Sequence, residues 1–298
     1  MYTHLVLGGG GIKGCVLTGA LEAFDTIFNI NRIKYIIGSS AGGVVGAMLC
    51  IGYTPKELSE IFLHLNLAEY RDIKISNMLS TYGTDDCSKL MRLLKSIIIQ
   101  KCDYNITFKE LYSKTGKTLI LTGSNISDIK TVFFSRLTYP DMKVIDALRI
   151  TLSYPFLFEP IKINNKYFID GAALDDYPMN YFKNIKSKIG IILKTKREKN
   201  KPEYDIKNFF GYTGAVIFSI VKKFNNMCLA KNIENTIVIK LPDIHALEFG
   251  ISYKTKLNLR NIGYRTTIKY LNNKIMKHYN YYSLKKSFYI LKNYIPDL

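Results

Sequence analysis

The sequence predicts an α/β fold in which a mainly parallel sheet is covered by helices on both faces. Short apolar segments alternate with longer helix-like segments along most of the 298 residues, and this alternation is typical of parallel sheets. Two of the apolar segments end in glycine-rich turns that lead directly into a helix-like segment, at the edge where such sheets bind ligands. The apolar fraction of 47% and the mean hydropathy of +0.00 exclude a disordered chain and an integral membrane protein.

The first strand and helix flank a run of glycines. His4–Leu7 is predicted to be a strand and Cys15–Ile27 a helix. The same order returns with a strand at Tyr35–Ile37, a turn at Gly38–Gly43 and a small-residue helix at Val44–Ile51. Further apolar segments predict the remaining strands at Leu119–Thr122, Thr131–Phe134, Tyr167–Ile169, Ile189–Leu193 and Thr236–Ile239.

Capping and breaking residues place the other helices. Thr54-Pro55-Lys56-Glu57 has the residues of a capping box with proline in the first turn, which predicts a helix to about Asn66. Thr84-Asp85-Asp86 is predicted to begin a helix to about Ile99, and Pro155 is expected to stop one over Val144–Ser153. A final helix is expected to bury an apolar face made of Tyr253, Leu257, Tyr264, Ile268, Leu271 and Ile275.

An apolar run of 13 residues, Phe209–Val221, is followed by Lys222 and Lys223. The run is too short to cross a bilayer. We expect a buried core helix here, and an interfacial helix lying on a lipid surface is the alternative.

The chain is strongly basic, since 42 Lys and Arg against 24 Asp and Glu give a formal charge of +18. Half of this excess lies in residues 251–298, where ten basic residues accompany one acid, Asp297. Such a segment favours contact with an anionic membrane, although a coding bias toward Lys, Asn, Ile and Tyr would also produce it. Nucleic acid is not an expected partner, because no helix-turn-helix, zinc or RNP-type motif accompanies the charge.

The cysteines and the N-terminal residues indicate in which cellular compartment the protein is expected. Five scattered cysteines without a CxxC pair predict neither a disulfide framework nor a metal site. The N-terminal residues lack the charged and long apolar regions of a secretory signal. We therefore expect a cytoplasmic protein.

The first glycine turn, Gly8–Gly14, could bind an anion. Its Gly9-x-Gly11-x-x-Gly14 spacing matches a dinucleotide fingerprint, but no acidic residue closes the second strand to hold a ribose. A phosphate-binding loop of the Walker type would need lysine where Cys15 stands. Successive glycines at a helix N-terminus leave backbone N–H groups uncovered, so we expect an anion hole rather than a nucleotide site.

The second glycine turn has the pattern of a nucleophile elbow. Gly38-Ser39-Ser40-Ala41-Gly42 is a G-x-S-x-G sequence between an apolar strand and a small-residue helix. In that context the central serine, Ser40, is held on a tight turn, and the glycines leave room for neighbouring backbone. Ser40 is therefore the candidate nucleophile.

Two kinds of base could serve Ser40. Of the four histidines, only His245 lies in a loop that could approach a strand end, which would complete a Ser-His-Asp triad. Asp170 is the better candidate because it ends an apolar strand and is followed by the small residues Gly171 and Ala172. A carboxylate can take the serine proton if burial raises its pKa toward neutrality.

Taken together, these segments resemble the patatin-like phospholipase family. The resemblance rests on Gly9-Gly10-Gly11-Ile12-Lys13-Gly14, on the Ser40 elbow and on Asp170-Gly171-Ala172, in the family's order and spacing. Leu152–Pro160 is similar to the family's proline-containing segment before the aspartate strand, and Asp175-Asp176 stands where the family commonly has asparagine. The resemblance covers residues 1–272, which leaves 273–298 as a basic tail or final helix.

The resemblance implies a three-layer patatin-like fold and a lipid acyl hydrolase of the phospholipase A type. Ser40 and Asp170 would form a catalytic dyad acting through an acyl-enzyme, without metal or cofactor, and Gly10 and Gly11 would donate to the oxyanion. The expected substrate is a phospholipid or other acyl lipid, with peripheral attachment to an anionic membrane, and no oligomeric state is indicated. The alternatives are an inactive membrane-binding protein of the same fold and an esterase that uses His245.

Overall fold

The computed structural model describes residues 2–196, 206, 209–242, 248 and 250–294, without the side chains of 77, 209–210, 217–218 and 278–294. An eight-stranded sheet runs through it in the order β10-β9-β1-β2-β4-β8-β7, with β5 also paired to β4. The strands are β1 His4–Leu7, β2 Tyr35–Gly38, β4 Thr118–Asn125, β5 Lys130–Ser135, β7 Ile161–Ile163, β8 Lys166–Asp170, β9 Lys188–Thr195 and β10 Thr236–Leu241. All the predicted strands are present within a few residues.

The larger part of the sheet is parallel, as predicted. Strands β10, β9, β1, β2 and β4 pair in parallel, whereas β5, β7 and β8 join by antiparallel pairing. The carboxyl ends of β1 and β2 therefore lie at one edge of the sheet. Because β8 runs against β4 and pairs Asp170 with Gly123, its end comes back toward the middle of the sheet.

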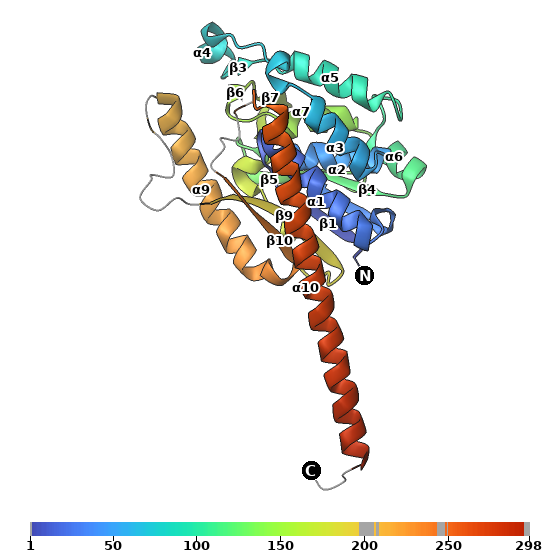
Figure 1. The fold of residues 1–298 in the computed structure, drawn as a ribbon. Coiled ribbons are helices and arrows are strands. Elements are labelled where there is room, and N and C mark those ends of the chain that lie inside the picture. The colour runs from blue at the N-terminus through green and yellow to red at the C-terminus, as the bar shows by residue number, and fades with distance from the viewer. Residues whose placement is uncertain (1, 197–205, 207–208, 243–247, 249, 295–298) are drawn as a thin grey trace.

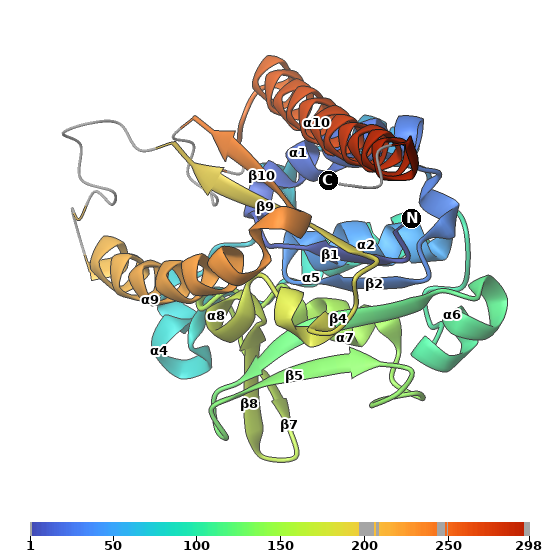
Figure 2. The same ribbon diagram turned by 90° about the horizontal axis from the view of Figure 1, so that it is seen from below.

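Helices cover both faces (Figures 1 and 2). In β1, Leu5 and Leu7 belong to a large core cluster and Val6, between them, to a smaller one, as the alternation of side chains along a strand requires. The large cluster lies under α1 Gly14–Ile27, α2 Ala41–Ile51, α3 Pro55–His64, α7 Val144–Thr151 and α10 Tyr253–Tyr294. The smaller one lies under the 3₁₀ helix η5 Met179–Phe182 and the end of α9 Phe209–Asn232.

Shorter elements complete the described chain. The remaining α-helices are α4 Met78–Thr81, α5 Ser88–Ile98, α6 Phe108–Thr115 and α8 Ala172–Asp175. The remaining 3₁₀ helices are η1 Gly11–Lys13, η2 Ile30–Arg32, η3 Leu67–Tyr70, η4 Ile75–Asn77 and η6 Ile233–Asn235. The strands β3 Gly83–Asp85 and β6 Phe156–Phe158 form a small separate parallel pair.

The predicted cap of α3 is confirmed. The Thr54 hydroxyl accepts from the Glu57 N–H at 3.2 Å, and the Glu57 carboxylate accepts from the Thr54 N–H at 2.7 Å. Pro55 is the first helical residue, where its missing N–H costs no hydrogen bond. The helix ends at His64, two residues before the predicted end.

The expectation that Thr84-Asp85-Asp86 begins a helix is wrong. Thr84 and Asp85 lie in β3, and α5 begins at Ser88. The buried Asp85 carboxylate pairs with Arg71 at 2.8 Å and also accepts from the Cys87 N–H. These contacts favour a strand followed by a turn, and they are invisible in the local pattern because Arg71 is distant in sequence.

The predicted apolar face of the last helix is also wrong at its two ends. Tyr253 and Ile275 are 49% and 40% exposed, whereas the buried stripe of α10 consists of Lys256, Leu259, Gly263, Thr267 and Leu271. A Cβ on Gly263 would lie 2.2 Å from the Val16 carbonyl oxygen of α1. The two helices therefore meet through glycine, and close backbone packing, not apolar periodicity, sets the buried face. The helix runs without a break through residues 272–273.

The expectation of a buried core helix at Phe209–Val221 is wrong as well. Tyr212, Val216 and Ile220 are 56%, 43% and 51% exposed, as are Phe224 and Met227 farther along α9 (57% and 53%). Among the described side chains of this helix, Cys228 and Leu229 near its C-terminal end join the core. Because η5 already covers that face of the sheet, the rest of α9 keeps an exposed apolar stripe, defined by Tyr212, Val216, Ile220, Phe224 and Met227. Within the described residues, no helix is long and apolar enough to span a membrane.

Candidate active site

Ser40 occupies a strained turn between β2 and α2. Its backbone φ is +52° and ψ is −126°, a conformation that costs about 1–3 kcal/mol for a residue with a side chain. Neighbouring backbone makes the flanking glycines necessary, since a Cβ would lie 2.4 Å from the Gly42 oxygen at Gly38 and 2.5 Å from the Gly8 oxygen at Gly42. The Ser40 N–H donates to the Thr151 hydroxyl at 3.0 Å. The turn therefore has the shape of a nucleophile elbow.

Asp170 ends β8 and is almost completely buried, with 1% exposure. Its Oδ1 accepts from the Ala172 N–H at 2.9 Å, whereas Oδ2 has no hydrogen-bond partner in the described structure. The Ser40 hydroxyl interacts with this carboxylate and lowers its pKa, although the two groups do not meet hydrogen-bond geometry. Such contacts commonly tighten only when substrate binds.

Burial dominates the acidity of Asp170. It raises the pKa to about 7 against the lowering effect of the Ala172 N–H and the Ser40 hydroxyl, and the charge of Asp176 raises it further. A carboxyl with this pKa can hold or release a proton near neutral pH. The next residue has to be small, because a Cβ on Gly171 would lie 2.0 Å from the Thr122 hydroxyl.

The glycine loop lies beside Ser40. The Gly9 N–H donates to Asp176, to the carboxylate at 3.0 Å and to the backbone oxygen at 3.2 Å. By contrast, the N–H groups of Gly10 and Gly11 have no partner within the described structure. Gly11 has a φ of +55°, which favours glycine at this position. In the described structure, the N–H groups of Gly10 and Gly11 are therefore available as donors beside Ser40.

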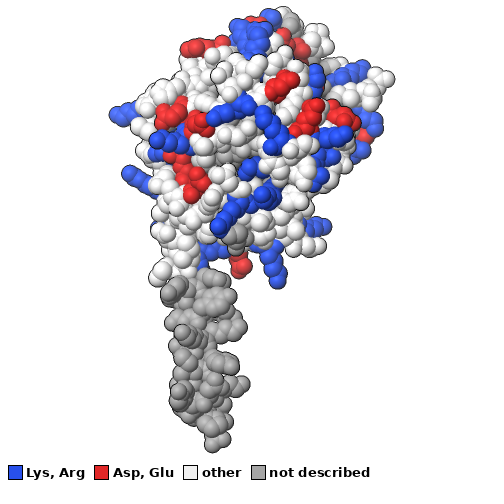
Figure 3. All heavy atoms as spheres, turned by 90° about the vertical axis from the view of Figure 1, so that its right-hand side faces the viewer, with Lys and Arg blue, Asp and Glu red and all other residues white. Residues whose placement is uncertain are grey.

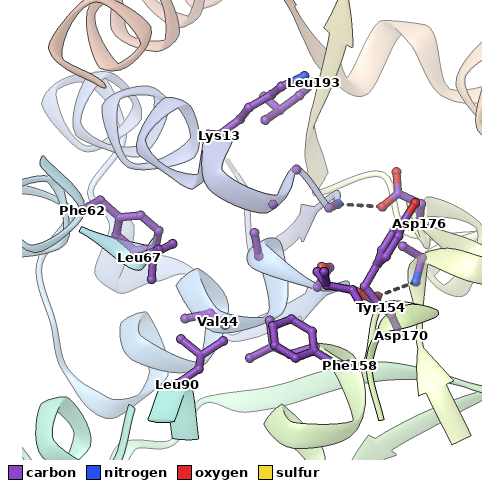
Figure 4. Close-up of a pocket in the computed structure, with 18 of the residues that line it drawn as sticks. Lys13, Val44, Phe62, Leu67, Leu90, Tyr154, Phe158, Asp170, Asp176 and Leu193 are labelled. Carbon is purple, nitrogen blue, oxygen red and sulfur yellow. Dashed lines mark hydrogen bonds between the residues drawn. The ribbon is translucent and has the colours of Figure 1, made fainter. Parts of the chain in front are cut away.

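These groups meet in a cavity of about 300 Å³ (Figure 4). Of the residues predicted for the site, Gly9, Gly10, Gly11, Lys13, Ser40, Ala41, Asp170 and Ala172 line it. The others, Ile12, Gly14, Gly38, Ser39, Gly42 and Gly171, lie behind the wall and shape the turns. In Figure 4 the acidic residues Asp170 and Asp176 lie on one side, and apolar side chains such as Val44, Phe62 and Leu90 lie on the other.

None of the described histidines lines the cavity. His4 stacks on Tyr35 in the sheet, and His64 is exposed at the end of α3. The alternative base His245 lies outside the described residues, and so does the side chain of His278. Among the described residues, the carboxylates that line the cavity with Ser40 are therefore those of Asp170 and Asp176.

Two cavity residues, Asp176 and Asn225, were not predicted as site residues. Asp176 receives the Gly9 N–H on one carboxylate oxygen and the Asn225 side-chain amide on the other, at 2.7 Å. The only signal in the sequence is the acidic pair Asp175-Asp176 where asparagine is common in the family. Asn225 gives no signal, because it lies 49 residues after Asp176 in the sequence.

The comparisons with known proteins agree with this geometry. The family model named patatin-like phospholipase matches residues 5–183. The chain belongs to the patatin-like phospholipase family. The match contains the glycine loop, Ser40 and Asp170, and family membership supports lipid hydrolase activity.

Viral relatives and a bacterial structure extend the likeness. A probable lipid hydrolase of Invertebrate iridescent virus 6 is 32% identical over 213 residues, 68% of each chain. An uncharacterized protein of Acanthamoeba polyphaga mimivirus is 30% identical over 93% of this chain and 95% of its own length. The crystal structure of VipD from Legionella pneumophila has a TM-score of 0.65 at 14% identity, covering 91% of this chain and 67% of that one. The structural likeness confirms the predicted patatin-like fold.

Proposed function

We propose that this patatin-like protein is a phospholipase A-type acyl hydrolase in which Ser40 and Asp170 form a catalytic dyad. The observation that carries the proposal is the buried Oδ2 of Asp170, which lacks a hydrogen-bond partner in the described structure beside the Ser40 elbow. A buried hydrogen-bond acceptor without a partner lowers the stability of the folded protein by about 1–3 kcal/mol, so its presence needs an explanation such as a catalytic role. Accepting the Ser40 proton during catalysis is such a reason.

The reaction follows from the positions of these groups. Ser40 Oγ attacks the ester carbonyl carbon while its proton passes to Asp170, and the carbonyl π electrons move onto the oxygen. The free N–H groups of Gly10 and Gly11 hold that oxyanion. Its collapse expels the alcohol, which takes the proton back from Asp170, and leaves an acyl-enzyme. Water then releases the fatty acid by the same steps, with Asp170 again as the base.

The apolar side of the cavity suits an acyl chain. Beyond Ser40 the wall consists of side chains from α2, α3 and α5, among them Val44, Met48, Leu58, Phe62, Leu90 and Leu94. Burying an acyl chain there favours binding by about 0.8 kcal/mol for each methylene that is taken out of water. The direct test is fatty-acid release from phosphatidylserine vesicles by the wild type and by Ser40→Ala. Release by the wild type alone supports the proposal, and equal release by both contradicts it.

The pH dependence of hydrolysis should follow the Asp170 carboxyl. Asp170 accepts the Ser40 proton only when it is deprotonated, and its pKa is raised to about 7. We therefore expect kcat/KM to rise with pH through about 7 and to level off above it, with a value about 100-fold below the plateau at about pH 5. Initial rates on a soluble short-chain ester measure this profile. A flat profile from about pH 5 to 9 would count against Asp170 as the base.

Chain-length preference should depend on the far end of the apolar wall. Leu90→Trp fills part of the cavity, so we expect kcat/KM for long acyl chains to fall about 10-fold or more while short-chain esters change little. The matched control is Ile99→Trp at the exposed end of the same helical segment, where the side chain is 56% exposed. Equal loss on both chain lengths would place the acyl chain elsewhere.

We also propose peripheral attachment to anionic membranes, through charge near the C-terminus and through the apolar stripe of α9. Part of the C-terminal charge is used inside the fold. The ammonium of Lys256 is bound by the Leu63 and Leu65 carbonyls, and Arg260 pairs with Glu22. Lys274 binds the Glu234 carbonyl. On the face shown in Figure 3, Lys and Arg side chains are mixed with Asp and Glu side chains. The apolar part of this proposed contact is the exposed stripe of α9, whose apolar side chains are accessible to a membrane surface.

Vesicle binding should separate these two contributions. We expect binding to anionic vesicles to weaken as salt shortens the Debye length from about 10 Å at 0.1 M to about 3 Å at 1 M. Lys277→Gln, Lys285→Gln and Lys286→Gln together should lower this salt-sensitive part. Ile220→Ser combined with Phe224→Ser should lower the part of the binding that salt does not weaken. Leu137→Ser serves as the control, because the Leu137 side chain is 63% exposed but lies after β5, away from α9 in the sequence. Co-sedimentation that is equal on neutral and anionic vesicles and indifferent to salt would reject the electrostatic part.

A further inference from the structure

Asp176 connects the glycine loop to a distant helix. Its backbone oxygen and its carboxylate both receive the Gly9 N–H. The other carboxylate oxygen receives the amide of Asn225, which lies in the middle of α9. The dashed line that reaches Asp176 in Figure 4 marks the loop contact, directly beside the cavity. One side chain thus links two elements far apart in the sequence.

The contact leaves the loop little freedom. A Cβ on Gly9 would lie 2.2 Å from the Asp176 carboxylate oxygen, so the Asp176 side chain packs against the Gly9 backbone in space that only glycine leaves open. The next residues along the loop, Gly10 and Gly11, carry the free N–H groups. Because consecutive peptide planes are joined by only two soft dihedrals, fixing the Gly9 amide restricts the directions of the following two.

We propose that Asp176 is a positioning residue, which holds the glycine loop so that the N–H groups of Gly10 and Gly11 face an ester at Ser40, and that Asn225 holds Asp176 in turn. The chemistry of the partners supports this. Both carboxylate oxygens accept hydrogen bonds from neutral donors, the Gly9 N–H and the Asn225 amide. Burial raises the pKa of Asp176, and these two donors oppose that shift because they favour the ionised carboxylate. The inference rests on the proposed function for its kinetic readout.

Asp176 also acts on Asp170 through its charge. The negative charge of Asp176 is among the causes that raise the pKa of Asp170, and no such effect comes from Asp175. Asp175 is the preceding residue, is also partly buried and carries the same charge. Within the described structure its side chain makes no hydrogen bond to the glycine loop, which makes Asp175 a matched control for the loss of a carboxylate from this turn.

The kinetic test compares four variants. Asp176→Ala should lower kcat about 100-fold with little change in KM, because the oxyanion donors lose their alignment. Asp176→Asn should stay within a few fold of wild type, since its amide oxygen can accept from Gly9 while the Asn225 amide rotates. Asn225→Ala should lower kcat about 10-fold, and Asp175→Ala should leave it unchanged. Asp176→Asn should also extend activity to lower pH, because one negative charge near Asp170 is removed.

Two results would overturn the inference. One is a kcat for Asp176→Ala equal to that of wild type. The other is an equal loss in Asp176→Ala and Asp176→Asn, because the bond from Gly9 to the backbone oxygen of residue 176 survives in both variants, whereas the bond from Gly9 to the side chain survives only in the second.

Amide hydrogen exchange of the segment 8–13 gives a readout that does not need turnover. We expect faster exchange there in Asp176→Ala than in Asp175→Ala, and equal exchange in both would contradict the inference even if the wild type hydrolysed no ester. Conversely, a wild type without hydrolase activity but with the expected exchange pattern would reject the proposed function and leave the positioning role in place.

Discussion

Ser40→Ala and Asp170→Asn are each expected to lower ester hydrolysis about 10³-fold or more, and the double variant should be little worse than either. The two side chains act in one proton transfer, so removing the second adds little once the first is gone. Initial rates on a soluble ester measure the three losses. Circular dichroism and the unfolding temperature establish that the variants remain folded.

A neighbouring serine provides the control for this result. Ser39 is completely buried, and its hydroxyl has no partner in the described structure. Ser39→Ala should therefore leave the rate within a few fold of wild type. Losses that multiply in the Ser40→Ala, Asp170→Asn double variant would show that the two residues act independently, which contradicts a dyad.

Gly42→Ala is expected to disable the nucleophile elbow. The added Cβ would lie 2.5 Å from both the Gly8 and the Leu7 carbonyl oxygens, and backbone atoms cannot move aside as side chains do. We expect a loss of about 1–3 kcal/mol or more in the free energy of unfolding. Because Ser40 is displaced, hydrolysis should fall about 100-fold in the protein that remains folded.

The adjacent glycine offers a matched comparison. A Cβ on Gly43 would meet the methyl groups of Leu121 and Thr151 at 3.1 and 3.2 Å. These side-chain ends can shift, and the nearest backbone atom, the Gly38 oxygen, is 3.3 Å away rather than 2.5 Å, so Gly43→Ala should keep most of the activity. Urea unfolding and initial rates measured on both variants decide the point. If Gly42→Ala lowers stability and activity no more than Gly43→Ala does, the elbow tolerates a side chain at a position where the structure leaves no room, which contradicts this account.

The sequence was sufficient for the parts of the site that depend on local backbone. The strand before Ser40, the flanking glycines and the small-residue helix all lie within a short stretch, and steric exclusion by neighbouring backbone explains why those residue types occur there. The strand that ends at Asp170 could likewise be predicted, because a buried apolar segment followed by Gly171 leaves the carboxylate at a strand end. The structure adds that this carboxylate has an oxygen without a partner among the described residues.

Features that depend on tertiary contacts could not be predicted. The exposed stripe of α9 was expected to be core, because an apolar run alone does not show that η5 already covers that face of the sheet. The buried face of α10 depends on close contact between Gly263 and α1, which periodicity of large apolar residues does not reveal. The link from Gly9 through Asp176 to Asn225 joins three separate segments, so no local pattern contains it.

Mapping the residue that reacts with a fluorophosphonate probe tests the proposed dyad most directly. The probe forms a covalent bond with an activated serine hydroxyl and mimics the tetrahedral intermediate. We predict that mass spectrometry will find the label on Ser40, with labelling much slower in Asp170→Asn and slower below about pH 7, where Asp170 holds its proton. A label on another serine, or ester hydrolysis by a protein that the probe does not modify, would contradict the role of Ser40 as nucleophile.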